Sequence, residues 1–278
     1  MKLYINLVAL LFLLPACKEA QRYASPPGYE MTKPYVINLP AEVEEISGLT
    51  YYGKDKSVFA INDENGILYK ITPGSQTKMQ RWKFAKQGDF EDLVLHNQVF
   101  YILQSNGTMY VVRFTGINNI ETQVVSFPFG EKNEFEAMYY DSARKKMIMV
   151  CKDCEDEKKK ALATFAFDVQ TLSFSESPLT IPTKILAEKL GVKKFKFKAA
   201  AAAVHPIDGQ LYILSSIYKL LIVVGDDGNI KQFYQLSPAL FKQAEGLTFS
   251  NDGTMIISNE AADVGTANLL IFNYRKPA

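Results

Sequence analysis

The 278-residue chain has little histidine, few cysteines and almost no net charge. Its formal net charge at pH 7 is +1, so it offers no bulk electrostatic attraction to nucleic acid, and we expect no nucleic-acid partner. It has only two histidines, His96 and His205, and no Gly-x-Ser-x-Gly motif, so the sequence does not support a Ser-His-Asp hydrolase. We expect His205 to pack in the core at the end of a strand and His96 to lie in a turn.

No apolar run is long enough to be a comfortable membrane span. The apolar residues 3–14 are fewer than the about 20 that a transmembrane helix needs. They follow the basic Lys2 and lead into Leu-Pro-Ala-Cys at residues 14–17, where a small residue precedes a cysteine, as in a bacterial lipobox. We therefore predict a lipoprotein signal peptide at residues 1–17 and lipidation of Cys17. The alternative is an ordinary signal peptide cut nearby, with Cys17 incidental.

Both interpretations export the chain. Lipidation predicts attachment to a membrane through the acyl chains on Cys17, because lasting anchorage needs more than one chain. The expected location is the cell envelope, as an outer-membrane lipoprotein that faces the periplasm or the cell surface. Residues 18–34 have little apolar periodicity and contain Pro-Pro-Gly at 26–28, which predicts a tether.

Cys151 and Cys154 are the other two cysteines, spaced as Cys-x-x-Cys. In an exported chain this spacing most simply predicts a local disulfide. A zinc site would need two further ligands, and a thioredoxin-like site would need a helix behind the first cysteine, whereas residues 147–150 have the composition of a strand. Free thiols, and a metal or redox site, are the alternatives.

The most informative feature is a frame that recurs five times, in which an anchor residue precedes an alternating apolar strand. The anchor residues are Ser47, Glu91, Glu136, Ala201 and Glu245. Their spacings are 91−47 = 44, 136−91 = 45, 201−136 = 65 and 245−201 = 44. A period near 45 with several strands in each unit is typical of a β-propeller.

Each unit contains four predicted strands, except the last, which ends after its third. The spare strand at residues 35–39 can complete the last unit and close the ring, which hides the sheet edges. We therefore predict an all-β domain at residues 35–278, a five-bladed β-propeller of four-stranded blades closed by the N-terminal strand. A six-bladed propeller, the alternative, would need a hidden unit inside 170–200. We expect helical turns at 185–190 there, ended by Gly191.

Several frames resemble those of the SdiA-regulated family of bacterial β-propellers. They are Glu-Ile-Ser-Gly-Leu-Thr-Tyr at 45–51, Ile-Asn-Asp-Glu-Asn-Gly at 61–66, Asp-Phe-Glu-Asp-Leu at 89–93 and Glu-Gly-Leu-Thr-Phe at 245–249. The resemblance covers residues 35–275. It implies a calcium-associated five-bladed propeller distantly similar to propeller phytases. The chain departs from a full ring of carboxylates at Ser47 and Ala201.

Several carboxylates should converge at one end of the central channel, because the predicted strand ends that carry them meet there. The starts of the innermost strands contribute Glu45, Glu91, Asp92, Glu136 and Glu245, and the loops after the second strands contribute Asp63, Glu64, Asp153 and Glu260. The candidate metal ligands among them are Glu45, Asp63, Glu91, Glu136, Glu245 and Glu260. Two carboxylates about 4 Å apart repel by roughly 4 kcal/mol at an effective dielectric of 20, so a cation, a shared proton or a lysine must offset the repulsion. Oxygen ligands suit Ca²⁺, for which we expect Glu91, Glu136 and Glu245 as ligands, with Asp63 or Glu260. Alternatively, each glutamate caps its own blade, with Lys152 neutralising nearby charge.

Lysines are expected at the rim of the same face. Lys196 and Lys198 alternate with Phe195 and Phe197, and either form a solvated edge over inward-facing rings or hold an anion beside the cation. Lys152 is a third candidate for anion binding. Three functions follow as hypotheses. The first is a monomeric binding or scaffold module with a protein or small-molecule ligand on the acidic face, the second a Ca²⁺-dependent phosphoesterase, and the third a purely structural envelope protein.

Overall fold

The computed structural model describes residues 23–74, 77–130, 132–154, 161–177, 179–192, 195–261 and 265–277. The predicted signal peptide and Cys17 lie outside the described residues. None of the helices in the described ranges has the length and apolar character needed to cross a membrane.

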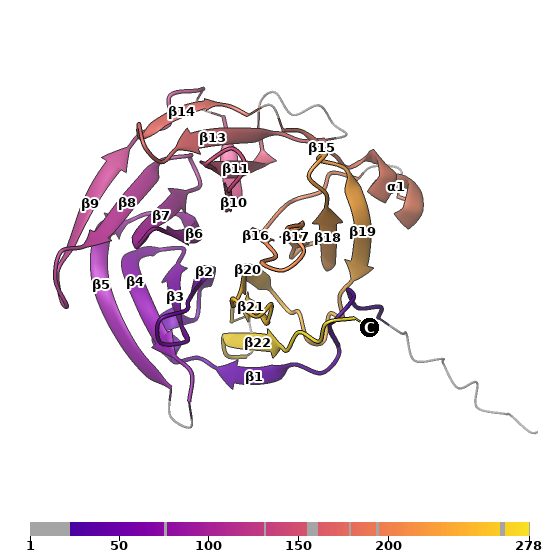
Figure 1. Ribbon diagram of the computed structural model, residues 1–278, viewed down its shortest axis with the longest axis horizontal. Helices are drawn as coiled ribbons and strands as arrows, with labels where there is room; N and C mark the ends of the chain where they lie inside the picture. Colours follow the sequence, from indigo (N-terminus) through magenta and orange to yellow (C-terminus); the bar gives the residue numbers. More distant parts are fainter. Residues whose placement is uncertain are drawn as a thin grey trace, which may run out of the picture.

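Five four-stranded antiparallel sheets surround a central axis and form a five-bladed β-propeller (Figure 1). Blade 1 contains β2 (Ile46–Tyr52), β3 (Ser57–Asn62), β4 (Asn65–Thr72) and β5 (Lys78–Gln87). Blade 2 contains β6 (Phe90–His96), β7 (Val99–Gln104), β8 (Met109–Phe114) and β9 (Ile120–Val125). Blade 3 contains β10 (Glu134–Asp141), β11 (Lys146–Asp153), β13 (Thr164–Asp168) and β14 (Ser173–Glu176). Blade 4 contains β16 (Ala201–Val204), β17 (Leu211–Ser215), β18 (Leu220–Val224) and β19 (Ile230–Gln235).

Blade 5 closes the ring by joining the two ends of the chain. It contains β20 (Ala244–Phe249), β21 (Met255–Asn259), β22 (Asn268–Phe272) and, as its outermost strand, β1 (Tyr35–Asn38). β1 pairs antiparallel with β22, with Tyr35 opposite Ile271. The predicted closure by the N-terminal strand is confirmed, and the six-bladed alternative is wrong.

The blades are held together by apolar side chains that alternate along the strands and pack between neighbouring sheets. Between blades 1 and 2, for example, the rings of Phe59 and Phe100 lie 4.6 Å apart, and Trp82 meets Phe114 edge-on at 4.9 Å. Gly48 lies where the inner strands of these blades come closest, since a Cβ there would lie 2.5 Å from the backbone nitrogen of Leu93.

The prediction of a tether is wrong for its second half. Tyr29 and Met31 are buried in the core shared by blades 4 and 5, and the Tyr29 hydroxyl donates a hydrogen bond to the carbonyl oxygen of Gly253 at 2.5 Å. The backbone nitrogen of Arg275 donates to the carbonyl oxygen of Gly28 at 2.8 Å. The proline-rich composition concealed two apolar side chains that pack only because both chain ends meet at blade 5.

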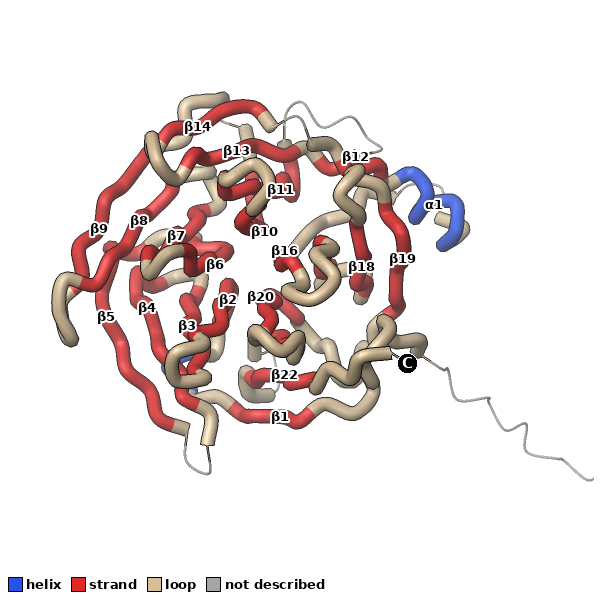
Figure 2. The backbone as a smooth tube through the Cα atoms, in the orientation of Figure 1, coloured by secondary structure: helices blue, strands red, loops and turns tan. Residues whose placement is uncertain are grey.

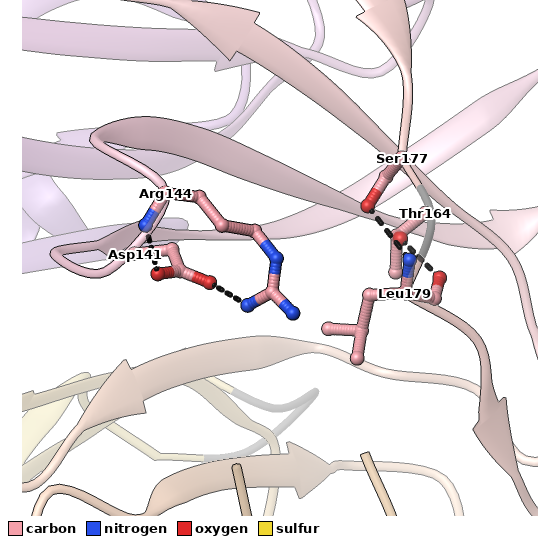
Figure 3. A network of polar contacts seen from close by, with 5 residues as sticks. All are labelled: Asp141, Arg144, Thr164, Ser177 and Leu179. Carbon is pink, nitrogen blue, oxygen red and sulfur yellow. Dashed lines mark hydrogen bonds and ion pairs between the residues drawn. The ribbon is translucent and has the colours of Figure 1, made fainter. Parts of the chain in front are cut away.

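The extra residues between blades 3 and 4 form a covering segment. β12 (Ala161–Leu162) pairs with β15 (Ile181–Pro182), and α1 (Lys184–Leu190) lies outside β19 (Figure 2). The Thr164 hydroxyl donates to the carbonyl oxygen of Leu179 at 2.6 Å, which fixes this segment to blade 3 (Figure 3). Gly191 ends α1 in the left-handed conformation, at φ +68°, as the sequence predicted. The short 3₁₀ helix η1 (Ala41–Val43) connects β1 to β2.

Candidate functional site

The register of each blade brings two sets of residues to one end of the channel. The innermost strands β2, β6, β10, β16 and β20 all begin there, at the anchor residue or one or two residues before it. The residue before the anchor pairs with the upper end of the second strand, as Ile46 does with Asn62 and Ala244 with Asn259. The residue that directly follows this pairing partner on the second strand also lies at this end of the channel. In four of the blades it is Asp63, Ser105, Lys152 or Glu260. We call this end of the propeller the acidic face, and the opposite end, with the turns that follow the innermost strands, the turn face.

A cavity of about 260 Å³ opens at the acidic face. Seven carboxylates line it: Glu45, Asp63, Asp89, Glu91, Glu136, Glu245 and Glu260. All six carboxylates predicted as metal ligands are therefore brought together. Asp89 was missed, although it lies two residues before its anchor, as Glu45 does before Ser47. Lys152, Gln243 and the small residues Ser47 and Ala200 also contribute to the wall.

Burial and mutual repulsion make these carboxyl groups hard to ionise. Burial, followed by the charges of Glu136 and Asp89, raises the pKa of Glu91 to about 9. Burial and the charge of Glu136 raise the pKa of Glu245 to about 8. On the other side of the cavity, burial and the charges of Asp63 and Glu45 raise the pKa of Glu260 to about 7. The cavity therefore disfavours its own full negative charge and would be stabilised by a cation.

Asp63 has the clearest unmet interaction in the cavity. Burial and the charge of Glu45 raise its pKa to about 6, and its Oδ1 atom is buried without a hydrogen-bond partner. Glu260, by contrast, accepts a hydrogen bond from the side-chain nitrogen of Gln243. A buried acceptor without a partner costs about 1–3 kcal/mol, so Asp63 is poised for a donor or a cation.

Lys152 neutralises one sector of the cavity. Its Nζ atom forms ion pairs with Glu136 and, at 2.9 Å, with Glu134. Burial lowers the pKa of Lys152, but the hydrogen bonds with the two glutamates outweigh burial and raise the pKa above its ordinary value. The charge of Glu136 is therefore largely balanced within the protein. In the part of the chain that the structure describes, Glu91 and Glu245 form no ion pair, although a hydrogen bond from Ser216 lowers the pKa of Glu245 in part.

The carboxylates have the right chemistry for a hard cation but are spread around the cavity. Among the described residues, no three histidine, cysteine, aspartate or glutamate side chains are grouped closely enough to hold a metal ion. A Ca²⁺ ion with its ligands at about 2.3–2.6 Å would therefore require glutamate side chains to turn toward a common point.

The alternative that the anchor glutamates cap their blades is not supported. The backbone groups between inner strands are instead satisfied by other side chains: Asp92 Oδ2 accepts from the Met138 nitrogen at 2.6 Å, and Thr248 Oγ1 from the Tyr51 nitrogen at 3.2 Å. Asp92 is almost fully buried, and burial raises its pKa well above the ordinary range despite two backbone donors. In the described part of the chain, no backbone N–H donates to the carboxylates of Glu91, Glu136 or Glu245.

The predicted anion-binding lysines lie at the rim or are already paired. Lys196 Nζ contacts Asp153 Oδ1 at 2.7 Å, and Lys152 binds two glutamates as described. Lys198 is half-buried, and its charge lowers the pKa of Asp153, though less than Lys196 does. Neither Lys196 nor Lys198 lines the cavity, and the Phe195 and Phe197 rings are buried.

The remaining residues singled out in the sequence lie away from the carboxylates or beside them. A disulfide joins Cys151 to Cys154 and brackets Lys152. His205 is fully buried and meets the Phe249 ring edge-on at 4.9 Å. His96 stacks on Tyr140 at 3.7 Å near the turn face. His205 is thus packed in the core, as expected, whereas His96, expected in a turn, is the last residue of β6. Neither histidine lines the cavity.

Three solved structures share the fold at low sequence identity. A luciferin-regenerating enzyme has a TM-score of 0.51 at 12% identity, over 87% of this chain and 95% of that chain. A streptogramin B lyase has a TM-score of 0.50 at 12% identity, over 87% and 99% of the two chains. The glutaminyl cyclase of Myxococcus xanthus has a TM-score of 0.53 at 11% identity, over 86% and 97%. These likenesses show the propeller fold alone, and a search of curated proteins gave no match.

A family model places the chain more specifically. The model of the SdiA-regulated family matches residues 26–262, which includes the packed Tyr29 and Met31 as well as all seven carboxylates of the cavity. The match covers more than half of the chain and agrees with the frames recognised in the sequence. The chain belongs to the SdiA-regulated family.

Proposed function

We propose that this protein is an exported, lipid-anchored binding module of the cell envelope whose acidic cavity binds a divalent cation, with Ca²⁺ as the first candidate. The observation that carries the proposal is the composition of the cavity, where seven carboxylates face one lysine. Export and anchorage come from the predicted lipidation of Cys17. A protein or small-molecule ligand would then bind over the loaded acidic face, with the propeller acting as a monomer.

The argument for a cation is electrostatic. Close carboxylates in a cavity must share protons, find cationic partners or bind an ion. Among the described carboxylates of the cavity, only Glu136 forms an ion pair with a lysine. Because their pKa values are raised to about 9 and about 8, Glu91 and Glu245 are protonated near neutral pH. A divalent cation would displace those protons. The donor atoms are all oxygens, which suits Ca²⁺ better than Zn²⁺ or copper.

The experiment is thermal unfolding of a chain that begins at Tyr23, which retains every contact described above. The protein is treated with EDTA and then given millimolar Ca²⁺ or Mg²⁺. A ligand at 100 times its dissociation constant adds about 2.7 kcal/mol, which raises Tm by about 5–11 °C in a domain of this size. We expect a Ca²⁺-selective rise that is lost in Glu91→Gln/Glu245→Gln and retained in the control Glu121→Gln, whose side chain is exposed on β9. No rise in the parent protein would refute the cation site.

We do not extend the proposal to a phosphoesterase. Hydrolysis of a phosphate ester would need free cationic side chains beside the ion, and Lys152 and Lys196 are engaged by carboxylates. Phosphatase activity that requires Ca²⁺ and disappears in Lys198→Ala would reinstate that second hypothesis.

A further inference from the structure

β5 is the outermost strand of blade 1 and is longer than the other outermost strands. It contains ten residues, against four to six in β1, β9, β14 and β19. It pairs with β4 on one side, and its other side is the edge of the sheet, on the outside of the propeller (Figure 2). Such an edge presents backbone N–H and C=O groups that no described strand pairs, so it can accept a strand from another chain.

β5 also carries more positive charge than any other outermost strand. It has no acidic residue, and all of its cationic residues are exposed; they are Lys78, Arg81, Lys83 and Lys86. Among the described residues, none of these four side chains takes part in an ion pair. β9 and β14 carry one glutamate each, β1 carries no charge, and the single lysine of β19, Lys231, pairs with Asp227 at 2.7 Å.

The charge of β5 selects the kind of strand that its edge accepts. Like charges directly opposite each other destabilise a strand pair, so β5 resists pairing with a second copy of itself, which is the usual effect of lysines on an edge. Opposite charges across a strand pair stabilise it. An extended polypeptide segment with acidic side chains satisfies both the backbone groups and the charges, whereas an anionic polysaccharide or lipid meets the charges alone.

The register of β5 determines where the acidic side chains of a partner must lie. From Lys78 to Lys83 every residue has a partner on β4 in unbroken antiparallel register, except where a bulge begins beyond Lys83. The next paired residue is Gln87, opposite Asn65, so the strand is irregular between these points. A partner strand can therefore pair with the regular residues 78–83. The cationic positions there are separated by 81−78 = 3 and 83−81 = 2 residues.

These three cations lie on both faces of blade 1, because side chains alternate along a strand. Arg81 and Lys83 share the face of Met79, which packs against the core between blades 5 and 1. Lys78 shares the face of Trp82, which meets blade 2. An antiparallel partner that places an acidic side chain opposite each cation has the pattern Glu-x-Glu-x-x-Glu, and a parallel partner has the reverse pattern, Glu-x-x-Glu-x-Glu.

We propose that the edge of β5 at residues 78–83 is a docking site for an extended acidic segment of a partner protein, which adds a fifth strand to blade 1. The backbone of β5 supplies hydrogen bonds, and the three cations select acidic side chains at the matching positions. None of the β5 residues lines the acidic cavity. The inference therefore goes beyond the proposed function and depends neither on cation binding nor on the lipidation of Cys17.

The test measures the fluorescence anisotropy of labelled, end-capped peptides with the full chain in detergent, at physiological salt and in EDTA. Two peptides carry the patterns Glu-x-Glu-x-x-Glu and Glu-x-x-Glu-x-Glu, with Thr and Val at the x positions. A third has the same composition with its three glutamates adjacent, and in a fourth set proline replaces two x residues, which removes backbone donors. The protein variant is Arg81→Gln/Lys83→Gln, and its matched control is Lys231→Gln, on the outermost strand of blade 4.

We expect one of the two register-matched peptides to bind at least about fivefold more tightly than the peptide with adjacent glutamates, and its proline version to lose measurable binding. Binding should fall at least about fivefold in Arg81→Gln/Lys83→Gln and stay unchanged in Lys231→Gln. Both variants should melt with the parent protein, because the substituted side chains are exposed.

Three results would overturn the proposal. Equal binding of the matched, adjacent and proline peptides would show a general surface for polyanions, without strand pairing. Undiminished binding in Arg81→Gln/Lys83→Gln would place the peptide elsewhere on the molecule. No binding of either matched peptide would exclude the docking site. The Ca²⁺ titration judges the acidic cavity separately, so failure of either proposal leaves the other standing.

Discussion

Glu91→Gln should remove part of the pH dependence of stability. In the folded protein the pKa of Glu91 is about 9, raised first by burial and then by Glu136 and Asp89, from an ordinary value of 4.5. Between these two values the folded state holds a proton that the unfolded state releases. The free energy of unfolding therefore falls as pH rises through this window, by up to about 1.4 kcal/mol per pH unit for one proton.

Over the two units from pH 5.5 to 7.5, Glu91 alone accounts for a loss of at most about 2.7 kcal/mol. Solvent that enters the cavity will reduce this figure. Glutamine has the shape of the protonated glutamate and cannot ionise. Glu91→Gln should therefore match the parent protein only below pH 4.5, where Glu91 is protonated in both states, and should exceed it by up to about 1.4 kcal/mol at pH 5.5 and by more at pH 7.5. The parent also contains Glu245, with a pKa of about 8, so some pH dependence should remain in the variant.

The assay is urea unfolding in EDTA at pH 5.5, 6.5 and 7.5, with Glu121→Gln as the exposed control. Saturating Ca²⁺ should reverse the order at pH 7.5, because the parent gains the cation and the variant loses a ligand. Equal slopes with pH for the parent and Glu91→Gln would refute the view that Glu91 is a buried carboxyl that resists ionisation.

Three further perturbations test other parts of the structure. Asp92→Ala leaves the buried backbone nitrogens of Leu93 and Met138 without their acceptor, so it should lower the free energy of unfolding in urea by about 1.5–3 kcal/mol. A loss below about 0.5 kcal/mol, the size of an ordinary surface substitution, would contradict this role of Asp92. Met31→Ala should lower the free energy of unfolding by about 2–5 kcal/mol because Met31 is only 2% exposed. The neighbouring Glu30→Ala should change it little, and equal effects of the two substitutions would show that residues 25–34 form a tether. Cys151→Ala/Cys154→Ala should lower the free energy of unfolding by about 2 kcal/mol by the loop-entropy relation. It should also weaken the Lys152–Glu136 ion pair, because the strand end that carries Lys152 is released. An unchanged Tm and an unchanged Ca²⁺ response would exclude both effects.

Much of the architecture could be predicted because its signals are local. Strand period, turn residues and the spacing of the anchor residues are all read within about 45 residues, and each blade is itself built from consecutive strands joined by short connections. The last unit lacks a fourth strand and the chain has a spare strand predicted at 35–39. Together they indicated the closure that β1 and β22 make. The six carboxylates were found for the same reason, since they lie at equivalent places of the repeat, although blade 4 supplies none of them. Asp92, Glu64 and Asp153, predicted for the same face, do not line the cavity.

The details of the site could not be read from that period. Alternation tells which side chains share a face but not which neighbour lies across a blade boundary. Asp92 and Glu91 are adjacent in sequence, yet Asp92 is a buried cap for blade 3 and Glu91 lines the cavity. Lys152 was expected near the acidic face, but its pairing with Glu134 and Glu136 depends on the register irregularity of β10 and β11.

The sequence by itself therefore determined the number of blades, their order and the end of the channel where carboxylates gather, because these follow from a repeat whose strands pair locally. Only the tertiary structure decided which carboxyl groups are left without a partner, which lysines are already paired and how much of the N-terminal segment is bound. Those outcomes depend on contacts between residues as far apart as Tyr29 and Gly253, whose side-chain packing and burial arise only when the ring closes.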